Sequence, residues 1–468
     1  MQIPILAGLY CDGDPALRTA LPVNRVPVPK DSGVSQGYLR PADGITPFGV
    51  TTGLCRGTIV WNGILYAVNG GNLCTVSASG VETVIGAVGD DGAPVSLDYG
   101  FDNLAIASAG QLWLYNPIDG LRQNVDPDLG QVDDVLWVDG YFMTTDGEFL
   151  VVTDLDDPLA VNPLKYGSSE ADPDPVIAIL KLRNEVAALN RHTVEFFDNI
   201  GGDLFPFQRI EGAQIEKGCI GKDACCVYAE AIAFLGSGFN EQPAVYIGAN
   251  GNAAKISTHE VDTLLEAYTE AELSEVILEA RNEGAHNFLY MHLPDRTMVY
   301  DAAASAALQQ PVWFVLVTAM EGFAQYRARH FVYAFNQWLC ADPQASRLGS
   351  LTRTVSTFYG EKVRWEFGTM IVYNESGGAL FNRLELFGLT GSVALGVDPV
   401  ISTSYSIDGR SWSTPRTINA GVQGATSKRL VWLRQGHMRD RRVQRFQGTS
   451  DAHVSFARLD ATLEPLAW

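Results

Sequence analysis

Hydrophobic and polar residues alternate in short runs along most of the chain, and Gly, Asn or Asp residues separate successive runs. This pattern is typical of antiparallel strands joined by tight turns. Pairs of runs begin about 30–60 residues apart, which is the spacing expected of a β-propeller built from four-stranded blades. The sequence therefore predicts an all-β fold whose main body, residues 46–365, is a propeller of six or seven blades. The expected hairpins are Thr58–Val76, Leu104–Tyr115, Val135–Val152, Ile177–Phe197, Ile232–Ile256, Phe288–Tyr300 and Phe331–Leu351.

A helical insertion interrupts this strand pattern over residues 257–283. Ser257-Thr258-His259-Glu260 and Thr269-Glu270-Ala271-Glu272 both have the form of a capping box, and apolar residues follow each box at helical spacing. Two short amphipathic helices packed against the outside of a blade are expected here. A surface that docks a partner is the alternative.

The two ends of the chain differ from the middle. Residues 1–45 have no sustained periodicity, and Pro22, Pro27, Pro29 and Pro41 favour an extended arm over a central strand. We expect this arm to order against a neighbouring domain or subunit. Residues 366–468 contain longer alternating runs, which predict a separate antiparallel β-sandwich domain.

The charge balance narrows the function classes. Lys and Arg number 33 against 54 Asp and Glu, for a net charge of −21, which argues against a protein that wraps nucleic acid. Hydrophobic residues make up 46% of the chain, so a large core can form. The seven Cys have irregular spacing without a C-x-x-C pair, which indicates free thiols in a reducing cytoplasm. The sequence shows no signal peptide and no apolar stretch long enough to insert into a membrane.

Catalytic and metal-binding signatures are missing from the sequence, so we expect no enzyme activity, no cofactor and no metal. The chain has no G-x-S-x-G, H-E-x-x-H or P-loop motif, and its seven His are scattered. Residues 406–412, Ser-Ile-Asp-Gly-Arg-Ser-Trp, are similar to the Asp-box hairpin of sialidases, in which the Asp caps the turn. A propeller protein that binds or cleaves carbohydrate is therefore the alternative reading, and a bacterial interaction module is a third.

Basic residues are concentrated near the C-terminus. In a strand–loop–strand segment, Leu430 and Trp432 would pack inward while the basic side chains project outward. We interpret them as an interface that binds carboxylates of a subunit or partner, because Arg forms bidentate pairs with carboxylates. A solvated strand face and a DNA contact are the alternatives. The residues are Lys428, Arg429, Arg434, Arg439, Arg441, Arg442 and Arg445.

The order of motifs along residues 20–460 resembles that of a known family, the tail hub or nozzle proteins of short-tailed phages related to the lambdoid Salmonella podoviruses. These proteins are also called packaged-DNA stabilisation proteins or tail accessory factors. The N-terminal half contributes Leu21-Pro22-Val23-Asn24, Gly37-Tyr38-Leu39-Arg40, Cys55-Arg56-Gly57, Thr153-Asp154-Leu155-Asp156-Asp157 and Glu216-Lys217-Gly218-Cys219. The C-terminal half contributes Tyr268-Thr269-Glu270-Ala271-Glu272, His292-Leu293-Pro294-Asp295, Asp408-Gly409 and Lys428-Arg429-Leu430-Val431-Trp432.

This resemblance implies a structural virion protein of the tail, made in the host cytoplasm. Such proteins form a hexamer below the portal and its adaptor ring, seal the packaged DNA and form the channel for its ejection. The resemblance further implies docking sites for a tailspike or tail fibre and for a tail needle or plug. It implies passing DNA that is not bound by sequence, and it supplies no catalytic residues.

Overall fold

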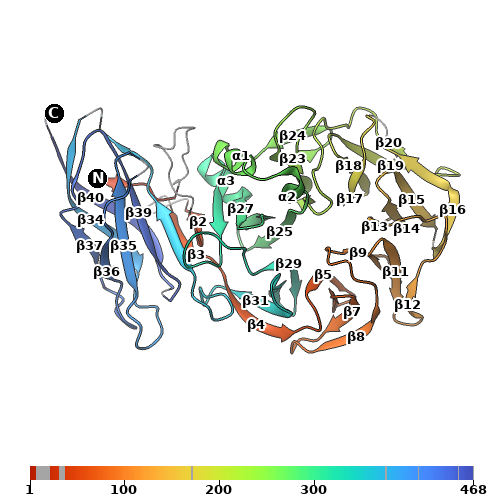
Figure 1. Cartoon of the computed structure of the whole chain (residues 1–468), viewed down its shortest axis with the longest axis horizontal. Helices are drawn as coiled ribbons and strands as arrows, with labels where there is room; N and C mark the ends of the chain where they lie inside the picture. The colour runs from red at the N-terminus through yellow and green to blue at the C-terminus, as the bar shows by residue number, and fades with distance from the viewer. Residues whose placement is uncertain are drawn as a thin grey trace.

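The computed structural model describes residues 1–6, 22–30, 37–155, 157–169, 172–374, 377–408, 411–451 and 453–466. Their strands form seven four-stranded sheets and two larger sheets. The four-stranded sheets stand around a common centre, and the larger sheets lie together at the other end of the long axis (Figure 1). The chain is therefore a propeller followed by a sandwich, as the sequence predicted, and the propeller has seven blades where the strand spacing allowed six or seven.

The first six blades are antiparallel meanders of four consecutive strands, and several of their connections are tight turns with left-handed residues. In the second blade Ala109 and Gly110 have φ of 52° and 73°, which closes the two-residue turn expected from the sequence. The first four blades are β5 (Cys55–Trp61), β6 (Ile64–Asn69), β7 (Asn72–Val76) and β8 (Glu82–Ala87); β9 (Ser96–Tyr99), β10 (Leu104–Ser108), β11 (Gln111–Asn116) and β12 (Gly120–Gln123); β13 (Asp134–Val138), β14 (Tyr141–Thr145), β15 (Phe149–Asp154) and β16 (Asp157–Ser168); and β17 (Val176–Leu182), β18 (Glu185–Asn190), β19 (Val194–Asn199) and β20 (Phe207–Arg209).

The last blade takes its outermost strand from the beginning of the chain. β4 (Gly44–Val50) pairs with β31, where Ile45 lies opposite Leu351, and this pairing joins the first and last blades of the ring. The other strands of blades five to seven are β21 (Cys225–Tyr228), β22 (Ala231–Gly236), β23 (Ala244–Ala249) and β24 (Asn252–Lys255); β25 (Ile277–Glu283), β26 (His286–His292), β27 (Thr297–Asp301) and β28 (Trp313–Leu316); and β29 (Arg329–Ala334), β30 (Gln337–Ala341) and β31 (Arg347–Thr352).

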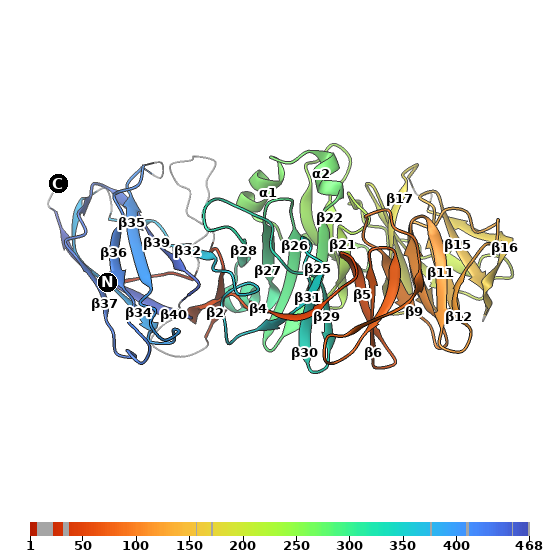
Figure 2. The same ribbon diagram turned by 60° about the horizontal axis from the view of Figure 1, so that its bottom comes forward.

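Three short helices accompany the later blades. α1 (His259–Leu265) and α2 (Glu270–Ser274) lie on one face of the propeller (Figure 2), with Val261, Leu265 and Leu273 buried against the blades. The predicted capping box at Thr269 and Glu272 is present, whereas Thr258 makes no side-chain cap. The expected helical segment 257–283 is helical only to Ser274, since Ile277–Glu283 is β25. α3 (Ala302–Leu308), which the sequence analysis did not anticipate, follows β27.

The sandwich combines strands from both ends of the chain. Its seven-stranded sheet contains β1 (Gln2–Ile3), β2 (Arg25–Pro29), β3 (Gly37–Pro41), β34 (Ala379–Leu389), β37 (Leu430–Leu433), β38 (His437–Met438) and β40 (Ser455–Pro465). Its five-stranded sheet contains β32 (Arg364–Gly368), β33 (Val372–Tyr373), β35 (Val400–Ser406), β36 (Arg416–Asn419) and β39 (Arg441–Thr449). Aromatic rings fill the space between the sheets, among them Trp365, Phe367, Phe446 and Phe456.

The described parts of the expected arm, residues 1–45, are thus strands paired within this chain. β1 pairs with β40, and β3 meets β40 at Leu39 and Phe456. β2 lies at the end of the sheet order, where Pro27 and Pro29 are tolerated because an edge strand leaves some N–H positions unused. Cys11 and the rest of residues 7–21, together with residues 31–36, lie outside the described residues.

Candidate assembly surfaces

A short N-terminal segment joins the propeller to the sandwich. Val23 exchanges backbone hydrogen bonds with Glu366 of β32 at 2.8 and 3.1 Å, while the Asn24 amide donates to the carbonyl of Val315 in β28 at 2.8 Å. The Asn24 side chain is buried; its Nδ2 donates to the carbonyls of Val317 at 2.9 Å and Arg364 at 2.7 Å, and its Oδ1 accepts from the Val317 amide at 3.1 Å. Both domains are therefore hydrogen-bonded to the same two residues.

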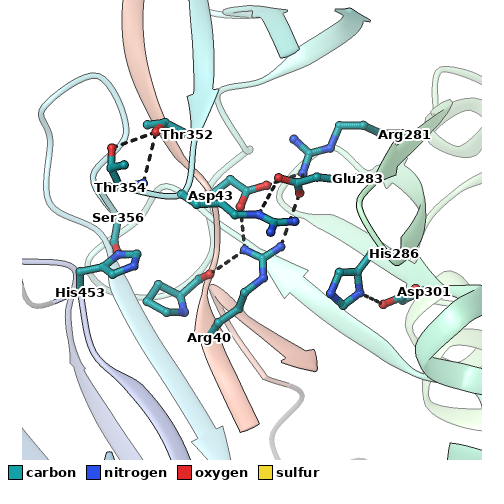
Figure 3. A network of polar contacts seen from close by, with 12 residues as sticks. Arg40, Asp43, Arg281, Glu283, His286, Asp301, Thr352, Thr354, Ser356 and His453 are labelled. Atoms are coloured by element: carbon teal, nitrogen blue, oxygen red, sulfur yellow. Dashed lines mark hydrogen bonds and ion pairs between the residues drawn. The ribbon is translucent and has the colours of Figure 1, made fainter. Parts of the chain in front are cut away.

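A buried ion network lies at the same junction (Figure 3). Arg281 of β25 contacts Asp43 and donates to Glu283 at 2.6 Å, and Arg40 of β3 donates to Asp43 at 2.6 Å. Burial acts to raise the pKa of Asp43, but the charges of Arg40 and Arg281 outweigh it and hold that pKa below its usual range. Burial acts to lower the pKa of Arg281, but Tyr290, followed by Asp43 and Glu283, raises it instead. Residues 40–43 and β25, which are far apart in sequence, are thus held together by charge.

This network was not visible in the sequence. Arg40 and Asp43 stand three residues apart, but their partner Arg281 is 238 residues from Asp43. No local pattern marks such a contact. The one available signal was the presence of charged residues beside apolar runs in strands, which by itself also fits a solvated face.

The propeller axis contains a hollow of about 450 Å³ lined by the innermost strands of several blades. Asp98 accepts a hydrogen bond from the amide of Trp137 at 2.6 Å, and Asp134 accepts one from the amide of Ile179 at 3.0 Å. Each carboxylate thus bonds the inner strand of the next blade. Burial raises the pKa of both groups, and that cost is offset by these inter-blade bonds. The two carboxylates have a structural explanation as links between blades.

Asp223 in the same hollow gives a testable pH dependence. Burial raises the pKa of Asp223 to about 6, against about 3.9 in an unfolded chain. Between these values the folded protein binds more protons than the unfolded one, so the contribution of Asp223 to stability falls as pH rises from about 4 to 6. Asp223→Asn is expected to stabilise the protein by on the order of 1 kcal/mol above pH 6 and not below pH 4.

The control for this variant is Asp203→Asn, because the Asp203 side chain is exposed. Chemical denaturation at pH 4 and pH 8 provides the measurement. Asp223→Asn should raise the free energy of unfolding at pH 8 only. An equal increase at pH 4, or an equal increase in the Asp203 variant, contradicts the raised pKa of Asp223.

The basic residues near the C-terminus do not form one continuous patch. Lys428 is exposed at the beginning of β37 and Arg434 is exposed at its end, with Arg439 exposed and Arg441 half-buried near that second end. Arg429 already pairs with Glu385 of the neighbouring strand, at 2.7 and 2.9 Å. The strand therefore separates Lys428 and Arg429 from the other exposed cations.

Two of the seven basic residues, both on β39, pack against aromatic rings, and only Arg442 of the two faces the sandwich core. Arg442 is buried, donates to the Gln435 carbonyl at 2.7 Å and lies over the rings of Phe381 and Tyr405, and burial lowers its pKa to about 9. Arg445 is half-buried over the ring of Trp412, 4.0 Å from its centroid. The expectation that Arg442 projects outward is corrected, because its aromatic partners come from strands distant in sequence. Leu430 and Trp432 are buried, as the alternation predicted.

The Asp-box-like hairpin has a local structural role. Asp408 Oδ1 accepts from the Ser411 amide at 2.8 Å and from the Ser406 hydroxyl at 2.9 Å, so Asp408 caps the turn. This hairpin follows β35 and lies in the sandwich, not in the propeller. The six described cysteines are free thiols. Among the described residues, no helix has the length and apolar character needed to cross a membrane.

Both domains of the chain match models of known protein families. Residues 1–356 match the family model described as "Bacteriophage P22 Gp10, beta-propeller", and residues 364–464 match "Bacteriophage P22 Gp10, beta-sandwich". The chain belongs to the P22 Gp10 family. It is 29% identical over 462 residues to the tail hub protein gp10 of Salmonella phage P22, covering 94% of each chain. The family places this chain among phage tail hub proteins, which confirms the resemblance found in the sequence.

Similarity between this member of the P22 Gp10 family and solved structures is low. The WD40 domain of Neurospora crassa Pan2 is 9% identical and has a TM-score of 0.43, covering 66% of this chain and 95% of that one. The N-terminal domain of Nup159 is 10% identical with a TM-score of 0.41, covering 71% of this chain and 99% of that one.

Proposed function

We propose that this tail hub protein assembles with five further copies into a ring below the portal and its adaptor ring. In that position the ring seals the packaged DNA and forms the channel through which the genome leaves. The observation that carries this proposal is the match to the P22 tail hub protein over 94% of both chains, through a propeller and then a sandwich.

The junction supports a mechanical role for each copy. Hydrogen bonds from Val23 and Asn24, together with the Arg40–Asp43–Arg281 network, tie the propeller to the sandwich. A rigid two-domain subunit can hold docking surfaces for a tailspike or tail fibre and for a needle or plug in fixed relative positions. The proposed role is structural and involves no catalysis or cofactor.

The charge of the chain fits a passage for DNA. A subunit with net charge −21 gives a strongly negative ring, and such a surface repels the phosphate backbone. DNA would therefore pass without sequence-specific binding. The carbohydrate-processing alternative rested on the hairpin at residues 406–412, and the capping bonds of Asp408 give that hairpin a structural explanation.

Particles that lack this chain test the proposal. We expect heads assembled without it to package DNA and then lose it, so that nuclease digests most of the genome, and supply of the intact chain to restore protection. Particles that retain and eject DNA normally without the chain contradict the proposal. Hydrolysis of surface polysaccharide by the purified chain would contradict a purely structural role.

The exposed cations at the second end of β37 give a further prediction. Arg439→Glu combined with Arg441→Glu is expected to lower tail occupancy of particles severalfold, because like charges then face an acid-rich partner surface. Arg442 is not changed, because it is buried and a glutamate at this position would destabilise the fold. Counting tails by electron microscopy provides the measurement, with Lys362→Glu as an exposed control. Unchanged occupancy contradicts an interface role for these two residues.

A further inference from the structure

A hollow of about 680 Å³ opens on the outer face of the seven-stranded sheet, beside the junction with the propeller. Leu39 and Phe456 lie opposite each other and are buried between the sheets. Because side chains alternate along a strand, Tyr38 and Arg40 point to the opposite, outer face. Phe387 and Leu389 of β34 line the hollow with them, as do Lys30 and Arg353. The size is within the range of ligand pockets, about 300–1,000 Å³.

The hollow is positively charged, unlike the chain as a whole. Three guanidinium groups, those of Arg40, Arg281 and Arg353, face the two carboxylates of Asp43 and Glu283, so one positive charge remains. Lys30 lies over the Tyr38 ring at 5.0 Å and has no carboxylate partner among the described residues. Arg40 Nε is buried without an acceptor in the described structure. An occupant of this hollow should therefore carry a carboxylate.

The walls of the hollow require an apolar group beside that carboxylate. Leu389 is 76% exposed and Phe387 is 36% exposed, and both stand on a sheet face that polar side chains would normally cover. Covering these side chains removes apolar surface from water, which favours association. The matching ligand is a protein segment with an aromatic or branched apolar side chain next to an acidic one.

A segment with this chemistry projects from the second blade. Phe101 is 85% exposed and Asp102 follows it; Ile118, in the neighbouring turn, is 91% exposed. Tyr99 pairs with Leu104, and Leu104 with Tyr115, so both turns lie at the same end of the blade, about 10 Å apart at the usual strand spacing. The Phe101 ring packs edge-on against Trp137 at 5.5 Å, which holds the tip in place.

The hollow and this tip lie on opposite sides of the molecule. β3, which carries Tyr38 and Arg40, stands beside the sandwich (Figure 1), whereas β9, at whose end the Phe101 turn begins, lies with β12 in the half of the propeller away from the sandwich (Figures 1 and 2). One chain cannot fill its own hollow with its own tip. A contact between two different surfaces on two copies of the chain is a heterologous interface. Repeating such an interface closes into a ring when the rotation between neighbouring copies is a whole fraction of a full turn.

We propose that the hollow binds the Phe101–Asp102 tip of a second copy of this chain, with Ile118 beside it. Asp102 meets Lys30 and Arg40, and Phe101 covers Phe387 and Leu389. This inference rests on the ring proposed above and assigns a contact within it.

Charge exchange tests the contact in assembled particles. Lys30→Glu alone and Asp102→Lys alone are each expected to lower tail occupancy about tenfold, because each places like charges in contact. The two changes together restore the attraction and are expected to return occupancy to within about twofold of the unaltered chain. The melting temperatures of the purified variants exclude misfolding as the cause. Loss in both single variants without recovery in the double variant, or no loss in either, overturns the inference.

Cross-linking separates failure of this contact from failure of the ring. With Asp102→Cys and Leu389→Cys in one chain, a short bismaleimide is expected to produce covalent dimers and higher species, and either single variant should produce no more than the unaltered chain with its own free thiols. Particles that contain a complete ring of this chain but give no cross-linked ladder overturn the inference and leave the proposed function intact. Particles without any ring overturn the proposed function itself.

Discussion

Replacing Asn24 by alanine is expected to lower the free energy of unfolding by about 3–5 kcal/mol, the largest effect of any single uncharged side chain at the junction. The substitution removes three hydrogen bonds and leaves the amide and carbonyl of Val317 and the carbonyl of Arg364 buried without those partners. It also places alanine at a φ of 51°, where Asn is tolerated better than Ala. Chemical denaturation and calorimetry measure the loss.

Asn62→Ala is the matched control for the cost of placing alanine in a left-handed backbone conformation. Asn62 has the same φ of 51° but is exposed in a turn of the first blade. We expect this variant to lose only about 1–2 kcal/mol. Equal losses in the two variants would show that the bridging hydrogen bonds of Asn24 contribute nothing, which contradicts our account of the junction.

Replacing Arg281 by methionine is expected to cost about 3–5 kcal/mol in unfolding free energy near neutral pH, since it takes one buried cationic partner from both the buried Asp43 and the half-buried Glu283. The size of the effect should depend on pH. The pKa of Asp43 lies below its unfolded value, so the stability that this group contributes is present above about pH 4 and is lost as pH falls further. The difference in unfolding free energy between the Arg281 variant and the unaltered chain should therefore become smaller below pH 4.

Arg353→Met provides the comparison on the same carboxylate. Arg353 donates to Glu283 at 2.8 Å, but its side chain is 51% exposed, so we expect a loss below about 1 kcal/mol. Unfolding measured at pH 7 and pH 3 distinguishes the two sites. An Arg281 variant as stable as the Arg353 variant at pH 7 would mean that the buried network does not hold the domains together.

Local pattern was sufficient to predict the propeller. A blade is a meander whose strands are neighbours in sequence, so alternation and turn residues such as Ala109-Gly110 carry the necessary information. The closing strand β4 was not recognised as part of the last blade, because its partner Leu351 is some three hundred residues away from Ile45. The same distance effect hid the pairing of β3 with β40.

Proline gave correct but incomplete information at the N-terminus. Pro27 and Pro29 indicated that this segment is no central strand, and β2 does lie at an edge. They could not identify the sheet to which the edge belongs. An extended arm and an edge strand have the same local signature, and only the distant partner distinguishes them.

The basic residues near the C-terminus show how far a candidate site can be predicted from sequence alone. Seven cations close in sequence suggested one surface, but the direction of each side chain depends on strands elsewhere. Arg442 lies over rings from β34 and β35, and Arg429 pairs with Glu385. The interface role of Lys428, Arg434, Arg439 and Arg441 stays a prediction, and the junction hollow emerged only once distant segments were placed together.

Cryo-electron microscopy of intact particles tests the central claim most directly. A reconstruction of the tail should show six copies of a seven-bladed propeller joined to a sandwich, arranged as one ring around the path of the DNA below the portal and adaptor. A tail without this chain, or with a copy number other than six around that path, would contradict the account.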